Sequence, residues 1–268
     1  MLLSWFVKLL VFVVIIYLLI CLVYLVFQEK IIFHPQKLDN SYVYQYQVPF
    51  QEVNISTVDG AILNGVLCKH SAKAKGVILY FHGNASHVFD LGWLGEKFYN
   101  LGYDALIMDY RSYGKSTGKL SQSNLFADAE LIYQKLLGDY NSSDIIIYGR
   151  SIGSGIAIHL ASKVKCQKLI LETPYASLVD LAGYYTPYLP YSLLVRYPLE
   201  SDKYMQQVTV PVYIFHGDSD SIVPYASGQK LADSTPSLAE FVTIKGGEHN
   251  NLSEYPSFYE NLERILGE

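Results

Sequence analysis

Charge is scarce in this chain, and basic charge is the scarcer of the two signs. Charged side chains make up 17% of the 268 residues, and the 20 lysines and arginines stand against 25 acidic residues, for a formal net charge of -5. A protein that binds a nucleic-acid backbone needs a basic face that neutralises phosphates. We therefore expect no nucleic-acid partner.

Cysteine is rare as well. Cys21, Cys68 and Cys166 are widely separated, and none has the paired spacing of a zinc or redox motif. Internal repeats and low-complexity segments are also missing from the sequence. We expect neither a disulfide framework nor a metal or other cofactor, and the length predicts one domain, residues 51–268, with a well-buried core.

The N-terminal segment has no charge over the 19 residues 9–27, which are almost all apolar. As a helix this run reaches about 28 Å, enough to cross the hydrocarbon core of a bilayer. A cleaved signal peptide is the alternative, but the run is long and no small residues follow it as a cleavage site. Residues 1–27 are therefore predicted to be a single-pass membrane anchor. Lysines flank the run on both sides, so the side of the membrane stays open.

Beyond a connector at residues 28–50, apolar runs of strand length alternate with helical patterns. Two early strands followed by this alternation predict an α/β domain with a mostly parallel eight-stranded sheet and helices on both faces. The expected strands are 53–58, 62–67, 77–81, 105–108, 145–148, 169–171, 212–215 and 241–244, and the expected helices are 124–137, 153–163, 226–232 and 255–266.

Residues 173–207 interrupt the alternation after the sixth strand and contain four prolines and seven tyrosines. A loop this long inside a compact domain is usually a functional lid or a small inserted subdomain. We interpret the segment as a small lid. The alternative is an insertion that only packs on the core.

Residues 149–153, Gly-Arg-Ser-Ile-Gly, match the G-x-S-x-G pattern, in which a serine lies on a sharp turn from a strand to a helix. Residues 114–118 match too, but Ser116 lies several residues past its strand and loop residues follow it. The same stretch resembles the end of a phosphate-binding loop, yet Asp109 occupies the place of that motif's first glycine. Ser151 is therefore the candidate nucleophile, and nucleotide binding is rejected.

A serine hydroxyl needs a base within hydrogen-bond reach, and a carboxylate must orient that base. His249 lies in a glycine-flanked loop between the last expected strand and helix, which makes it the first candidate, and His87 is the histidine least excluded as a competitor. The acid is expected in the loop after the seventh strand, where Asp218 and Asp220 are both possible. The spacing His-Gly-x-x-Asp-x-x-Val-Pro of residues 216–224 favours Asp220, and the alternative role for Asp218 is that of a turn residue that closes the strand end.

Attack on a carbonyl also needs two amides aimed at the oxyanion. The amide of Ile152, directly after the nucleophile, is one candidate donor. The amide of Asn84, in the glycine-containing loop after the third strand, is the other. The alternative interpretation of the second loop is a plain turn.

These motifs together resemble the membrane-anchored α/β-hydrolase domain proteins. The resemblance rests on residues 81–85, 109–116, 149–153 and 172–178, on the loop after His216, and on the order Ser151, Asp220, His249, and it extends over nearly the whole chain from Gln28. It implies the α/β-hydrolase fold and cleavage of acyl esters or thioesters. One branch of the family removes palmitate from proteins, but that branch typically has a cysteine-rich N-terminus, where this chain has only Cys21.

Three functions follow as hypotheses. The first is a serine hydrolase that cleaves carboxylic esters or thioesters of amphiphilic, acyl-chain substrates through an acyl-enzyme, next to a membrane. The second is a serine peptidase or amidase, although peptidases of this fold usually carry an extra propeller or large cap for which the chain has no room. The third is a catalytically silent binding protein.

Overall fold

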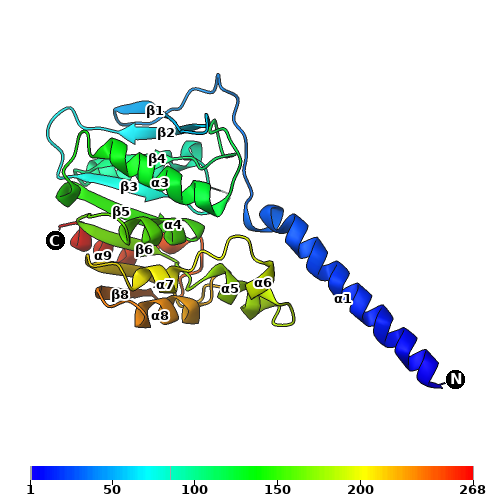
Figure 1. The fold of residues 1–268 in the computed structure, drawn as a ribbon. Coiled ribbons are helices and arrows are strands. Elements are labelled where there is room, and N and C mark those ends of the chain that lie inside the picture. Colours follow the sequence, from blue (N-terminus) through cyan, green and yellow to red (C-terminus); the bar gives the residue numbers. More distant parts are fainter. Residues whose placement is uncertain (1, 85, 268) are drawn as a thin grey trace.

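The computed structural model describes residues 2–84 and 86–267, in which an eight-stranded sheet is covered by helices and a long N-terminal helix projects away (Figure 1). The strand order is β1-β2-β4-β3-β5-β6-β7-β8. β2 pairs antiparallel with β1 and β4, and all other neighbours are parallel. All eight predicted strands are confirmed: β1 Phe50–Ser56, β2 Ile62–Cys68, β3 Val77–Phe81, β4 Asp104–Met108, β5 Ile145–Arg150, β6 Lys168–Glu172, β7 Val212–Gly217 and β8 Leu238–Ile244.

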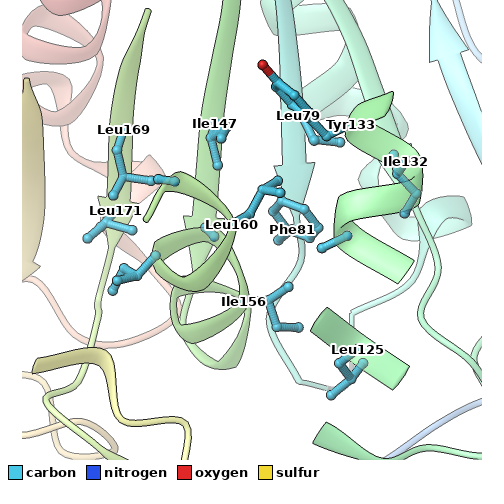
Figure 2. Packing of buried hydrophobic residues seen from close by; sticks show 14 of the residues in the cluster. Leu79, Phe81, Leu125, Ile132, Tyr133, Ile147, Ile156, Leu160, Leu169 and Leu171 are labelled. Carbon is cyan, nitrogen blue, oxygen red and sulfur yellow. The ribbon is translucent and has the colours of Figure 1, made fainter. Parts of the chain in front are cut away.

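Side-chain alternation along the central strands divides the core into two layers, as the period of two requires. On β3, Leu79 and Phe81 face one layer, and Ile78 and Tyr80 face the other. Figure 2 shows the first layer, where Phe81 lies close to Ile156 of the helix that follows β5. The sheet is thus buried on both faces, which explains the continuous apolar runs of its strands.

Helices cover both layers. α3 (Gln122–Leu136), α4 (Ile152–Ala161) and α8 (Tyr225–Asp233) contribute to the first, and α2 (Gly92–Asn100) and α9 (Pro256–Gly267) to the second. The sequence patterns predicted all of these except α2. Short 3-10 turns lie at η1 (Val88–Leu91), η2 (Ser142–Asp144) and η3 (Leu252–Glu254).

The helix α1 spans Leu2–Ile32 and projects from the domain, with its C-terminal half in contact with the insertion (Figure 1). The most apolar 18-residue stretch of α1 has a mean hydropathy of 3.3. Among the described residues, α1 is the one helix long and apolar enough to cross a membrane. It continues past residue 27, the predicted end of the anchor, because the polar side chains of Gln28 and Glu29 find partners on the domain. The division into anchor, connector and domain remains a prediction.

The insertion between β6 and β7 contains three short helices, α5 (Leu178–Tyr185), α6 (Tyr191–Leu194) and α7 (Ser201–Met205). α6 contacts α1, and α5 packs against α6 (Figure 1). The function of this insertion as a lid remains a prediction.

Candidate active site

Ser151 lies on the turn between β5 and α4, with backbone angles φ 50° and ψ -122°. For a residue with a side chain this conformation costs on the order of 1–3 kcal/mol, a strain typical of functional sites. The turn is tight because Gly153 allows close approach: a Cβ there would collide with the carbonyl oxygen of Phe81. The amide of Ser151 donates to the carbonyl of Glu172 on β6 at 2.9 Å, which ties the turn to the sheet.

His249 lies between Ser151 and Asp220 in a continuous chain of hydrogen bonds. Its Nε2 is 2.8 Å from Ser151 Oγ, and its Nδ1 is 2.8 Å from Asp220 Oδ2. The three residues come from the ends of β5 and β7 and from the loop after β8, so the parallel sheet collects at one edge groups that are far apart in sequence. In this arrangement Nδ1–H donates to the carboxylate, and Nε2 is free to accept the serine proton.

The carboxylate of Asp220 is fully buried and yet held ionised. Burial by itself would raise the pKa of Asp220, but hydrogen bonds from His216 and His249 and from the amide of Val223 outweigh it and hold the pKa well below its usual range. The amides of Ile222 and Val223 donate to Oδ1 at 2.9 and 2.8 Å. Oδ2 is thereby left for the histidines.

The competing residues have other partners. Asp218 is exposed, and its Oδ1 accepts the amide of Gly246 at 2.7 Å, so it closes a turn. His87 contacts Asp90 and accepts the amide of Gln36. Ser116 is buried, where its hydroxyl donates to the carbonyl of Asp109 at 2.8 Å. The structure places none of these three beside Ser151.

The loop after β3 lies directly against Ser151, since a Cβ built on Gly83 would be 3.5 Å from Ser151 Cβ. The next residue, Asn84, is held by its side chain: Nδ2 donates to the carbonyl of Ile32 at 2.6 Å, and Oδ1 accepts from the amide of His34 at 2.9 Å. Ile152 is the first residue of α4, whose amino end carries partial positive charge. Both predicted oxyanion residues therefore flank Ser151, and the direction of their amides remains a prediction.

A cavity of about 670 Å³ opens beside these groups. Ser151 and His249 lie on its wall, and most of the remaining lining is apolar or aromatic. Part of the lining comes from α1, with Tyr24, Ile31 and Ile32, and part comes from the insertion, with Leu178, Leu181, Ala182, Tyr185, Thr186 and Tyr191. A cavity of this size and lining is typical of a small-molecule site.

Sequence reasoning missed two groups that hold the site together. The Arg150 guanidinium donates to Asn250 Oδ1 at 3.0 Å and to the carbonyl of His249 at 3.3 Å, and it pairs with the buried Glu172. His216 packs its Nε2 3.4 Å from Asp220 Oδ2. Arg150 lies at a variable position of the G-x-S-x-G pattern, and neither residue's sequence position carries a signal about its side chain's partners.

Metal chemistry has no support among the described residues, which contain no group of three histidine, cysteine or acidic side chains placed to hold an ion. Cys68 and Cys166 are buried, and burial raises the pKa of each thiol to about 12. Neither thiol is therefore a candidate nucleophile near neutral pH.

Known proteins resemble this chain in sequence. Residues 72–195 match the family model described as serine aminopeptidase, S33. The chain is 30% identical over 204 residues to an uncharacterized protein of Mycobacterium tuberculosis, covering 75% of this chain and 73% of that one. It is also 30% identical over 216 residues to alpha/beta hydrolase domain-containing protein 17C of Xenopus tropicalis, covering 78% of this chain and 67% of that one.

Solved structures give the same fold. An esterase of Pyrococcus furiosus superposes with a TM-score of 0.66 at 20% identity, over 88% of this chain and 96% of that chain. At this identity the likeness concerns the fold alone.

Proposed function

Because this chain belongs to the family of α/β-hydrolase domain-containing proteins, as its motifs predicted, we propose that it is a serine hydrolase that cleaves carboxylic esters or thioesters. Ser151 is the nucleophile, His249 the general base and Asp220 the acid that orients the base. The observation that carries the proposal is the unbroken series of hydrogen bonds from Ser151 Oγ through His249 to Asp220, each of 2.8 Å.

The reaction follows from these contacts. Ser151 Oγ attacks the carbonyl carbon while His249 Nε2 takes its proton, and Asp220 stabilises the imidazolium that forms. The amides of Ile152 and Asn84 donate to the oxygen that becomes negative. His249 returns the proton to the leaving alcohol or thiol, which departs and leaves an acyl-Ser151 ester. A water molecule, deprotonated by His249, then releases the acid and restores the serine.

The cavity favours an apolar acyl group as the part of the substrate that is recognised. The insertion, residues 173–207, forms one wall and in this proposal is the lid over the acyl chain. The apolar helix α1 is the membrane anchor, which places the site close to amphiphilic substrates. Each methylene buried in such a wall stabilises the complex by about 0.8 kcal/mol.

A serine aminopeptidase is the second candidate, favoured by the description of the matching family model. An aminopeptidase must bind the free amino group of its substrate, for which an acidic side chain is the natural partner. Among the described residues that line the cavity, none is acidic. The lining thus supports an ester or thioester over a peptide with a free amino terminus.

The decisive experiment combines an active-site probe with a substrate panel. A fluorophosphonate probe should label Ser151, as read by peptide mapping, and Ser151→Ala should lose both labelling and turnover. Ser116→Ala, the control at the second motif match, should keep both. Turnover of p-nitrophenyl esters or acyl thioesters supports the proposal. Turnover of aminoacyl anilides alone favours the aminopeptidase, and labelling of another serine contradicts the assignment.

A further inference from the structure

One face of α1 contacts the insertion over much of the apolar part of the helix. Tyr17 OH donates to the carbonyl of Tyr188 at 3.0 Å, the rings of Tyr24 and Tyr191 lie 5.1 Å apart, and Gln28 Nε2 donates to the carbonyl of Leu194 at 3.0 Å. Positions 17, 24 and 28 share a face of a helix with 3.6 residues per turn. The contact therefore runs about 16 Å along α1.

The part of the insertion that follows α1 carries no charge. We name residues 181–195 the apolar hairpin; it contains the second half of α5, the turn and α6, and it is bounded by Asp180 and Arg196. Several of its large side chains face outward, with Tyr188 83% and Leu193 82% exposed. Clusters of exposed apolar and aromatic side chains mark a surface that binds something other than water.

The polar boundaries of the two elements coincide in space. Glu29 is the first charged residue after the apolar run of α1, and Arg196 is the first charged residue after the hairpin. These two side chains form an ion pair at 3.1 Å. From this level the hairpin and α1 extend in the same direction (Figure 1). The tip at Tyr188 contacts Tyr17, about 15 Å further along the helix than Phe27, so it lies beside the hydrophobic part of α1.

The backbone of the hairpin also suits an apolar solvent, in which unbonded amides are costly. Pro187 and Pro190 have no amide hydrogen to satisfy. Other amides of the turn donate within the hairpin, as those of Thr186, Tyr191 and Val195 do to the carbonyls of Ala182, Leu189 and Tyr191. Tyrosine is enriched where protein crosses from water into lipid, which matches the hairpin's composition.

We propose that the apolar hairpin enters the bilayer beside α1, and that the cavity between them receives the acyl chain of a membrane-resident substrate directly from the lipid. The proposal rests on the membrane anchor and the hydrolase activity proposed above. Tyr24 and Ile32 line the cavity from α1, Leu181 and Tyr185 line it from the hairpin, and Ser151 lines the same cavity. The partner of this surface is thus a lipid leaflet.

Insertion is tested without any substrate. The full-length chain in phosphatidylcholine nanodiscs carries a fluorophore on Leu193→Cys, and quenching by lipids with a nitroxide on the acyl chain is measured. The matched control is Val58→Cys, fully exposed in the turn before β2, and the unsubstituted chain gives the labelling background. We expect strong quenching at position 193 and little at position 58. Equal, weak quenching at both positions overturns the insertion, whatever the enzyme hydrolyses.

Substrate entry is tested with the charge variants Leu193→Glu and Val58→Glu. We expect Leu193→Glu to lower turnover of a long-chain ester embedded in the nanodisc at least tenfold and to keep turnover of soluble p-nitrophenyl acetate, while Val58→Glu changes neither. Equal loss on both substrates, or loss on neither, overturns entry from the lipid. A chain that hydrolyses no ester at all contradicts the proposed function instead, and the quenching result then decides insertion by itself.

Discussion

Replacing Asp220 by asparagine tests the proposed catalytic arrangement most directly. The amides of Ile222 and Val223 donate to Oδ1 at 2.9 and 2.8 Å, so the oxygen of an asparagine must stay on that side. Its NH₂ group then faces His249 Nδ1, where the carboxylate oxygen lies at 2.8 Å in the wild type. An NH₂ group donates only, which forces Nδ1 to accept and places the ring proton on Nε2.

With a proton on Nε2, His249 is unable to accept the proton of Ser151. The same aspartate-to-asparagine replacement in the triad of a serine protease lowers kcat about 10⁴-fold, which corresponds to roughly 5.4 kcal/mol of activation free energy. We expect a loss of this order for Asp220→Asn in an ester assay, with the protein still folded, because the bonds to Ile222 and Val223 remain.

Asp218→Asn is the matched control. Its oxygen still accepts the amide of Gly246, and it lies in the same loop, so we expect kcat within about twofold of wild type. Steady-state kinetics on p-nitrophenyl esters and a thermal unfolding curve are needed for both variants. A large loss for Asp218→Asn with a small one for Asp220→Asn would refute the reasoning.

Three further outcomes are expected. Adding two carbons to the acyl chain should raise kcat/KM roughly tenfold until the cavity is full, and Leu181→Asp should flatten this series while sparing acetyl esters; equal loss on all chains would contradict a role in selection. Arg150→Met should lower the free energy of unfolding by about 3–5 kcal/mol, measured by chemical denaturation, because it leaves the buried Glu172 carboxylate without its cationic partner. Adding Glu172→Gln to this variant should recover part of the lost stability, and an unchanged unfolding midpoint in Arg150→Met would contradict the prediction. Burial raises the pKa of Asp109 to about 7, so the folded state holds that proton more tightly than the unfolded one and stability falls as pH rises from about 4 to 7. Asp109→Asn should flatten this part of the stability profile, and an unaltered profile would show that Asp109 is not its source.

Local sequence was sufficient for most of the fold. The central strands β3, β4 and β6 are short apolar runs buried at every position, and burial on both faces of the sheet leaves that signature. The helix α2 was missed, because its nine residues include two glycines and only a few apolar side chains to set a period. The nucleophile could be identified from the sequence for a related reason. The sharp turn at Ser151 requires glycine two residues away on each side, at Gly149 and Gly153, where a Cβ would collide with neighbouring atoms.

The choice between Asp218 and Asp220 shows what the sequence does not determine, which is the contacts that each carboxylate makes. The two residues have the same side chain and lie two positions apart, so the spacing of the motif favours Asp220 but says nothing of what either carboxylate contacts. What separates them is the path of the loop, which turns Asp220 toward His249 and the amides of Ile222 and Val223 and turns Asp218 toward Gly246.

By itself, the sequence determined that this chain has an apolar N-terminal helix and an α/β-hydrolase domain with a serine on a tight turn, because each of these depends on residues that are neighbours in the chain. Only the tertiary structure decided that the end of α1 forms part of the cavity wall and bonds to Asn84 through Ile32. It likewise decided that the apolar hairpin lies along α1. These contacts join residues about 50 to 170 positions apart, and they arise from the packing of whole elements, which leaves no pattern in any one segment.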